Sequence, residues 1–482
     1  MRLALTLIAL TVAGCVNAPA ATDESPAATV VPMGALMVHR DGVLVPETAE
    51  TLLGGVPQYV QHLVGTPGAE PSIGVTSSGA AFVTSDDLVR VSKDLGATWE
   101  TSYDFGPIHT GSPLGGPTDD PVSNWDAMLW VDPLTDRVFA PLMFPILTCS
   151  EVIYSDDDGA SWLDKPAGCG VPGMDHQRLA TGPYVAGGTL QPTSLYPNAV
   201  YFCYSKIASY HCATSVDGGL HFPIDRIVAV GPAACGGPGG TPHAAPDGTV
   251  FAPLGGLGGC GIVAIGVSRD NGLSWEVKTP DVGDLGQDEI DPDITVTPDG
   301  TAYYVFRALK DHVVYMIRSS DGFETIEGPW RVAPPGITST NFAQITSGTD
   351  GRVAIAYAGT RDTDAFANDA PDKTRWHLFV STSFDAAAAS PTFVTAQVTP
   401  DADPLQIGSI HYGGGSSPDR NLLEFIDAAT GPDGRVWVVF TDGCTNECAG
   451  KAGATPDDSR SRDTAVGVLA AGPSLSAALP GH

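Results

Sequence analysis

Paired apolar runs, each pair interrupted by a polar turn that contains glycine, recur along most of the chain. Three examples are SIGVTSSGAAFVT from Ser72, HAAPDGTVFAPL from His243 and DITVTPDGTAYYVF from Asp293. Short runs rich in valine, phenylalanine and tyrosine and bounded by glycine or proline predict β-strands joined by tight turns. A third run leads into another polar turn and a fourth leaves it. Each unit is therefore predicted to contain four antiparallel strands.

Seven such strand pairs can be counted. They are centred near Ile73, Met128, Leu179, Ala244, Ile294, Ile345 and Ala428. After the last pair, DTAVGVLAAG near the C-terminus is expected to supply the outer strand of its unit. Successive four-stranded units of similar length are typical of a β-propeller. The pattern predicts an all-β propeller of four-stranded antiparallel blades, with seven blades and six as the alternative.

The polar turn between the third and fourth strands carries a repeated motif, S-x-D-x-G-x-x-aromatic. Four good copies begin at Ser92, Ser155, Ser215 and Ser268, and weaker copies begin at Ser319 and Ser383. Their aspartates are Asp94, Asp157, Asp217 and Asp270, and their aromatic residues are Trp99, Trp162, Phe222 and Trp275. The aspartate can accept hydrogen bonds from turn amides, the glycine can take positive φ, and the ring can be buried. We interpret the motif as a structural turn.

This motif resembles the Asp-box, or bacterial neuraminidase repeat, of sialidases and other β-propellers. The resemblance covers roughly residues 65–475 and implies a sialidase-like propeller. Sialidases have six blades, so seven blades would separate this chain from them. They also hold the substrate carboxylate with three arginines, the first in an RIP-like motif, and RIP is absent here.

The first fifteen residues, MRLALTLIALTVAGC, combine Arg2 with an apolar run that ends in a cysteine. The run is too short for a mature membrane-spanning helix and resembles a bacterial lipoprotein signal, in which Cys15 becomes lipidated. An ordinary secretory signal is the alternative. The following segment is rich in Ala, Pro and Thr, which is typical of a tether. We predict a signal peptide at 1–14, a lipidated tether at 15–50 and a single propeller at 51–482, in a protein anchored in the periplasm or at the cell surface.

Eight cysteines remain when Cys15 is set aside, an even number that suits an oxidising compartment. Sequence alone does not fix how they pair. Nearest-neighbour pairing would give the disulfides Cys149–Cys169, Cys203–Cys212, Cys235–Cys260 and Cys444–Cys448. A metal site at the last pair is the alternative interpretation.

The chain is strongly acidic, with 55 acidic against 24 basic residues and a formal charge of −31. It has no cluster of lysine and arginine of the kind that phosphate binding requires, so nucleic acid is not expected as a partner. We expect a monomer that touches the membrane only through its lipid.

Blade topology indicates which residues gather at the centre. The loops that carry the repeated motif lie on one face, and the loops that lead into the innermost strands lie on the other, around a central funnel. Several ionisable and polar residues in the latter loops are candidates for a shared site. The catalytic candidates are Asp126, His176, His243, Glu289 and Glu424, and the substrate-binding candidates are Arg178, Asp291, Arg307, Asn341 and Tyr412. Each of them could instead brace a loop turn.

His176 and His243 are predicted on adjacent blades and could act as acid and base or bind a metal. No cofactor is required, although a divalent cation, calcium or zinc, could bind, and His176 and His243 are the candidate metal ligands. By the sialidase resemblance, Tyr412 with Glu424 would correspond to the tyrosine and glutamate of those enzymes and Asp126 to their acid, while Arg178, Arg307 and Arg420 would form a different cationic set.

These observations predict a protein that binds or processes an extracellular carbohydrate at the funnel. As an enzyme it would be a sialidase-like glycoside hydrolase, with two carboxylates at the reacting bond. The alternatives are a non-catalytic binding or assembly lipoprotein and a propeller-type polysaccharide lyase that uses a histidine as base.

Overall fold

A computed structural model divides the chain into Met1–Ala35 and Leu36–His482, and all the described residues lie in the second unit. They are 37–40, 43–44, 57–68, 70–85, 88–105, 128–142, 150–167, 174–206, 209–230, 239–255, 261–288, 291–348, 351–412, 417–424, 426–445 and 448–476. The signal, Cys15 and most of the tether lie outside them. No helix within these residues is long and apolar enough to cross a membrane.

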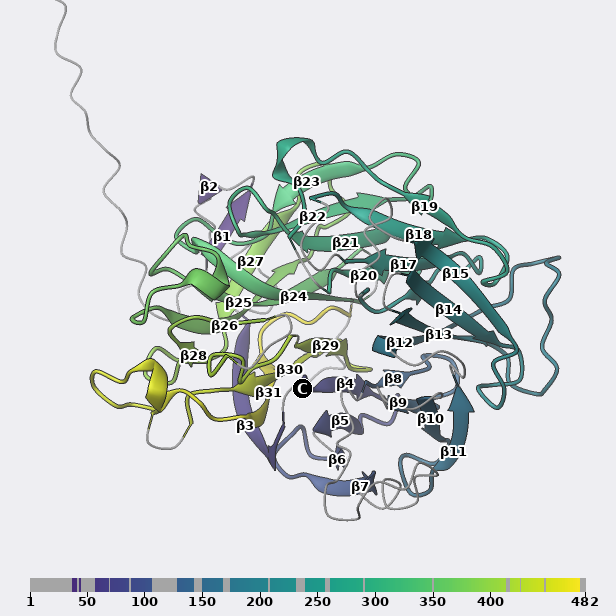
Figure 1. Cartoon of the computed structure of the whole chain (residues 1–482), viewed down its shortest axis with the longest axis horizontal. Helices are drawn as coiled ribbons and strands as arrows, with labels where there is room; N and C mark the ends of the chain where they lie inside the picture. The colour runs from purple at the N-terminus through teal and green to yellow at the C-terminus, as the bar shows by residue number, and fades with distance from the viewer. Residues whose placement is uncertain are drawn as a thin grey trace, which may run out of the picture. The chain divides into compact units, whose positions relative to one another are not determined.

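The described residues form a seven-bladed β-propeller, as the sequence predicts (Figure 1). Blade 1 contains β4 (Ser72–Val75), β5 (Ala81–Ser85), β6 (Leu88–Ser92) and β7 (Glu100–Asp104). Blade 2 contains β8 (Trp130–Val131), β9 (Val138–Leu142), β10 (Ser150–Ser155) and β11 (Leu163–Ala167). Blade 3 contains β12 (Met174–Gly182), β13 (Ala199–Lys206), β14 (Ser209–Ser215) and β15 (Ile224–Val230).

The next three blades follow the same order from the centre outward. Blade 4 contains β16 (His243–Ala244), β17 (Val250–Leu254), β18 (Ala264–Ser268) and β19 (Glu276–Lys278). Blade 5 contains β20 (Asp293–Val296), β21 (Ala302–Arg307), β22 (Val314–Ser319) and β23 (Glu327–Arg331). Blade 6 contains β24 (Ser339–Ser347), β25 (Val353–Thr360), β26 (Arg375–Ser383) and β27 (Thr392–Gln397).

Short elements surround these blades. β1 (Met37–Arg40) pairs with β27 and with β2 (Val43–Leu44), and β28 (Gln406–Ile407) pairs with β26. In the described part of the chain, single 3₁₀ turns are η2 (Gly283–Leu285), η3 (Ala367–Asp369) and η4 (Pro456–Asp458). β1 and β2 belong to the residues that the sequence assigns to the tether.

Blade 7 joins the two ends of the propeller. It contains β29 (Asp427–Thr430), β30 (Val436–Asp442), β31 (Asp463–Ala471) and β3 (Gln58–Pro67). The prediction that DTAVGVLAAG supplies the outermost strand is wrong, because β31 is the third strand and pairs on its other edge with β3 from the N-terminal side. This antiparallel pairing closes the ring.

The core lies between blades. The second strands of blades 1, 2, 4 and 5 are buried along their whole length, because both faces of each blade contact a neighbour. In β5, Phe82 packs toward blade 2 with Val138, whereas Val83 packs toward blade 7 with Trp437. Alternation along a strand sends successive side chains to opposite faces. Every blade boundary therefore has its own apolar cluster.

The repeated motif forms the same turn in each good copy. In blade 4, Ser268 Oγ and Ser274 N each donate to Asp270 Oδ1 at 2.9 Å, and Gly272 N donates to Ser268 Oγ at 2.8 Å. Although burial acts to raise it, these bonds to Ser274 and Ser268 hold the pKa of Asp270 below its usual value. Trp275 packs with the cluster between blades 3 and 4. The weaker copy at Ser319 makes the same set of bonds around Asp321.

We predict that Asp270→Ala destabilises the propeller by about 1–2 kcal/mol, because it leaves the turn amides and hydroxyls without their shared acceptor. Urea denaturation at pH 7 measures the change. Asp372→Ala, at an exposed loop carboxylate, is the control and should change the free energy of unfolding by less than about 0.5 kcal/mol. Equal effects of the two substitutions would contradict the structural role of the motif.

Candidate functional site

Four of the residues predicted from sequence meet at the side of the funnel where the innermost strands begin, which we call the funnel face. His176 Nδ1 lies 3.0 Å from Asp291 Oδ1, and His176 Nε2 lies 2.8 Å from Glu424 Oε2. Arg178 donates to the same Asp291 oxygen at 3.1 Å. These side chains come from blade 3 and from the loops before blades 5 and 7, and all are buried. We call them the histidine–carboxylate cluster.

Irregular backbone places the histidine. The pairing of β12 with β13 shifts register between Asp175 and Arg178, and His176 has a φ of 47°. A bulge of this kind turns one side chain away from the regular alternation, and bulges are common beside functional sites. Leu423, with a φ of 57°, precedes Glu424 in the loop that leads to β29. Both members of the His176–Glu424 contact thus depend on left-handed backbone.

The cluster balances its charges internally. A neutral imidazole has a single N–H, so His176 can donate to both carboxylates only as the imidazolium. Although burial acts to raise it, the hydrogen bond and charge of His176, together with Arg420, lower the pKa of Glu424 to about 2. Arg420 forms an ion pair with the other oxygen of Glu424. One carboxylate oxygen, Asp291 Oδ2, is buried and has no hydrogen-bond partner among the described residues.

A second group on the funnel face surrounds Arg307, at the end of β21. Its fully buried guanidinium donates to Asn341 Oδ1 and to the hydroxyl of Tyr412. It also lies 3.5 Å from Asp288 Oδ2 and over the ring of Phe366, 4.9 Å from the centroid. Asn341 Nδ2 is buried without a hydrogen-bond partner in the described part of the chain. We call these residues the arginine–aromatic group.

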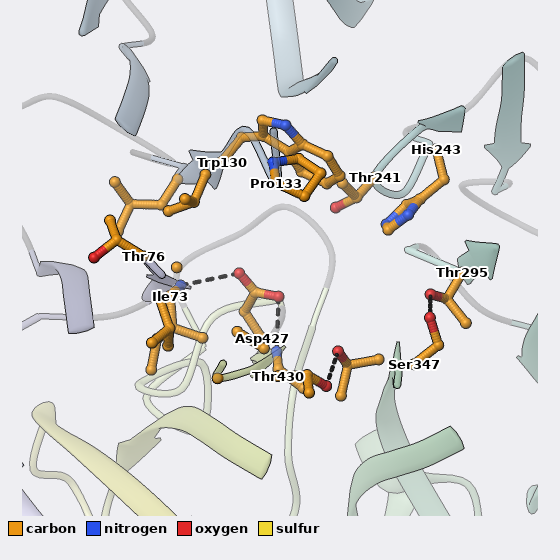
Figure 2. A pocket seen from close by; sticks show the side chains of 18 of the residues that line it. Ile73, Thr76, Trp130, Pro133, Thr241, His243, Thr295, Ser347, Asp427 and Thr430 are labelled. Carbon is orange, nitrogen blue, oxygen red and sulfur yellow. Dashed lines mark hydrogen bonds between the residues drawn. The ribbon is translucent and has the colours of Figure 1, made fainter. Parts of the chain in front are cut away.

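His243 lies apart from His176. It lines a cavity in the central channel, where its ring meets Trp130 edge-on with centroids 5.0 Å apart (Figure 2). Burial lowers the pKa of His243 to about 4, so the ring is neutral at pH 7. The joint metal site expected at His176 and His243 has no support in this geometry. Among the described residues there is no group of three or more His, Cys, Asp or Glu side chains that could hold a metal ion.

Of two further carboxylates in this cavity, Asp293 was not among the predicted site residues. Asp293 and Asp427 occupy the first positions of β20 and β29 and line the same cavity as His243. Burial and the charge of Asp427 raise the pKa of Asp293 to about 8, and burial also raises that of Asp427. The sequence signal for a ligand site at these two residues is weak, because the aspartates of DPD (291–293) and FID (425–427) could equally well stabilise loop turns. The spacing of two between Asp291 and Asp293 was the available hint.

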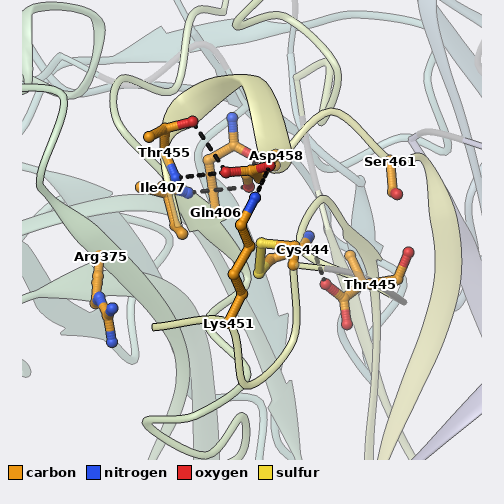
Figure 3. Close-up of a disulfide and its surroundings, with 12 residues drawn as sticks. Arg375, Gln406, Ile407, Cys444, Thr445, Lys451, Thr455, Asp458 and Ser461 are labelled. Carbon is orange, nitrogen blue, oxygen red and sulfur yellow. Dashed lines mark hydrogen bonds and ion pairs between the residues drawn. A yellow bond between two sulfur atoms is a disulfide. The ribbon is translucent and has the colours of Figure 1, made fainter. Parts of the chain in front are cut away.

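The remaining predictions divide between described and undescribed residues. Asp126, Glu289, Cys149, Cys169, Cys235 and Cys260 lie outside the described residues. The other two expected disulfides are present: Cys203–Cys212 links β13 to β14, and Cys444–Cys448 closes a short loop after β30 (Figure 3). Close to the latter, Lys451 pairs with Asp458 at 2.5 Å. The metal interpretation of Cys444 and Cys448 is therefore wrong, because their sulfurs are bonded to each other.

Comparisons with known proteins support the repeat. Residues 197–395, from blade 3 to blade 6, match the BNR repeat-like domain family. Among solved structures, a protein of unknown function from Dyadobacter fermentans has 13% identity and a TM-score of 0.40, with 90% of this chain and 99% of that chain covered. A Hadza microbial sialidase has 11% identity and a TM-score of 0.40, with 82% and 74% covered. Polysaccharide lyase Uly1 has 10% identity and a TM-score of 0.43, with 91% and 95% covered.

No curated protein matches. Likenesses at this level assign no activity, because one fold carries many functions.

We predict that Glu424→Gln lowers the free energy of unfolding by about 3 kcal/mol at pH 7, because it breaks a buried ion pair and leaves His176 with one anionic partner. The folded-state pKa of Glu424 is below its unfolded value, so its contribution is present above about pH 4.5 and is lost as the pH falls toward 2. Urea denaturation across this range should show the difference between parent and variant shrinking. Glu100→Gln, at an exposed position, should show no such difference.

Proposed function

We propose that this chain is an exported, lipid-anchored propeller that binds an extracellular carbohydrate on its funnel face. The observation that carries the proposal is a pair of buried polar atoms without hydrogen-bond partners in the described residues, the acceptor Asp291 Oδ2 and the donor Asn341 Nδ2. They belong to neighbouring blades 5 and 6. A sugar hydroxyl both donates and accepts hydrogen bonds, so the hydroxyls of one glycan suit both atoms.

The surroundings of these atoms also suit a sugar. Phe366 and Tyr412 are half-buried, and their rings meet edge-to-face with centroids 5.5 Å apart. Aromatic rings supply rigid apolar surface with little loss of side-chain entropy. Arg307 donates a hydrogen bond to the Tyr412 hydroxyl and so fixes its position. Polar groups held in place beside an aromatic surface are typical of small-molecule sites.

Binding is favoured over a lyase reaction by the state of His176. Both of its ring nitrogens are engaged by carboxylates, so it is not free to accept a proton. Glu424, with a pKa of about 2, carries no proton to donate at neutral pH. A glycoside hydrolase is the second candidate function, because burial raises the pKa of Asp288 beside Arg307, and a raised pKa is what a general acid requires.

We predict that Asn341→Ala and Tyr412→Ala each weaken glycan binding at least about tenfold, because each removes a group positioned for the ligand. A glycan array followed by calorimetry on the best binder measures the change. Glu324→Ala, in the Asp321 turn on the opposite face, is the matched control and should bind like the parent. Unchanged binding by both funnel-face variants would refute the proposal.

The parent and the variant Asp288→Asn should be assayed for release of reducing sugar from the glycan that the parent binds. Turnover that is present in the parent and lost in Asp288→Asn would favour the hydrolase candidate over binding alone. No turnover, with binding retained, supports a binding protein.

The anchor is proposed from the N-terminal sequence, and the two disulfides support export because they persist in oxidising compartments. We predict that Cys15→Ser releases the protein from membranes or leaves its signal uncleaved. Membrane fractionation with immunoblotting distinguishes these forms from the parent. Unchanged processing and fractionation would show that Cys15 is not lipidated.

A further inference from the structure

The cavity that contains His243 is separate from the funnel-face groups. Its volume is about 410 Å³, and residues of all seven blades line it. It extends from the first residues of the innermost strands, such as Asp293 and Asp427, to the turns that follow them, such as Thr76 and Pro432. In an antiparallel blade those turns lie on the same face as the Asp-box loops. The cavity therefore faces away from the arginine–aromatic group.

The wall combines hydroxyl groups, one large aromatic ring and carboxyl groups. Trp130 and His243 form one side, and the Thr295–Ser347 and Thr346–Thr430 hydroxyl pairs form another, each pair hydrogen-bonded at 2.8 Å (Figure 2). No lysine or arginine is among the described lining residues. An anionic ligand would find three carboxyl groups and no cation there, so the wall selects against acidic ligands.

Asp293 is the member of this wall that points to a ligand. The residue is 4% exposed, Oδ2 accepts a hydrogen bond from Ile345 N at 2.9 Å, and Oδ1 has no hydrogen-bond partner among the described residues. Burial and the charge of Asp427 raise the pKa of Asp293 to about 8, which favours the protonated carboxyl at pH 7. Because Oδ2 already accepts, the proton belongs on Oδ1. The carboxylic O–H is then a buried hydrogen-bond donor without an acceptor among the described residues, and a ligand oxygen could supply that acceptor.

A metal ion is a poor occupant for the same site. A protonated Asp293 offers no negative charge, and both oxygens of Asp427 already accept hydrogen bonds, from Ser72, Ile73 and Ala428. His243 is neutral and presents an imidazole that can donate or accept. Both oxygens of the third carboxylate, Asp136, already accept hydrogen bonds from Ser77. The groups that remain for a ligand are neutral donors and acceptors next to an indole ring.

We propose that this cavity binds a neutral glycosyl unit the size of one hexose, through the Asp293 carboxyl group, His243, the threonine and serine hydroxyls and the Trp130 ring. Its volume is within the range of small-molecule pockets. The assignment does not depend on the funnel-face site, because the two sites share no ligand-contacting residue.

The test is isothermal titration calorimetry with the full chain at pH 7, using glucose, galactose, mannose and N-acetylglucosamine, with glucuronate and calcium chloride as comparison ligands. At least one neutral sugar should bind, and glucuronate should bind at least about tenfold more weakly. Asp293→Ala should lower the affinity for that sugar at least about tenfold, because the donor is lost, whereas Asp293→Asn keeps a donor and should remain within about threefold. Thr295→Val is a second variant, in case Asp293→Ala fails to fold, and it should also weaken binding.

Asn341→Ala separates this proposal from the funnel-face proposal, since the sugar binding that Asp293→Ala removes should persist in it. The inference is overturned if no neutral sugar binds the parent, if glucuronate binds as well as glucose, if only calcium binds, or if Asp293→Ala and Thr295→Val bind like the parent. Loss of cavity binding in Asn341→Ala would also overturn it.

Discussion

Apolar packing between neighbouring blades is the interaction on which the rest of the structure depends. A single four-stranded sheet has two apolar faces, and both must be covered for the blade to be stable. Each boundary between blades has its own cluster, such as the one that joins Phe82 of blade 1 to Val138 of blade 2. Because every blade needs two neighbours, the arrangement is stable only when it closes. Closure then fixes a channel at the centre, and the seven innermost strands deliver their first residues to it.

The central channel is unusual because ionisable side chains, and not only apolar ones, are buried around it. Groups that are normally exposed, including His176, Arg178, Asp291 and Asp293, are almost wholly buried there. Burial of charge is unfavourable unless charges are paired or neutralised. The chain uses both solutions at different depths. Near the funnel face His176 bridges two carboxylates, and deeper in the channel burial and the charge of Asp427 raise the pKa of Asp293. Arg178 acts at both levels, since it donates to Asp291 and its charge opposes the burial that raises the pKa of Asp293 and of Asp427.

The repeat made the blades predictable from the sequence, because each copy of the motif and each strand pair is a local signal. The pairing of β31 with β3 could not be predicted in this way. The two strands are separated by about 400 residues, and the β3 sequence QYVQHLVGTP carries no motif. The funnel-face residues were predicted by topology, and His176, Arg178, Asp291 and Glu424 do meet. Which of them pair depends on the bulge at His176, and a bulge has no sequence signature here. The separation of His243 from His176 could not be predicted, because strand order gives the blade of a residue and not its height along the channel.

Closure through β3 also has a consequence for how the chain is made. β3 is synthesised before blade 1, yet its partner β31 follows the strands of blades 1 to 6 along the chain. Until then β3 is a strand with an unused edge, and blade 7 has no outer strand. Unpaired edges are prone to pairing with other chains, and contacts between distant residues form slowly. The step that gives the finished propeller its stability is therefore also the last that can occur, and the interval before it is when the chain is most exposed to misassembly.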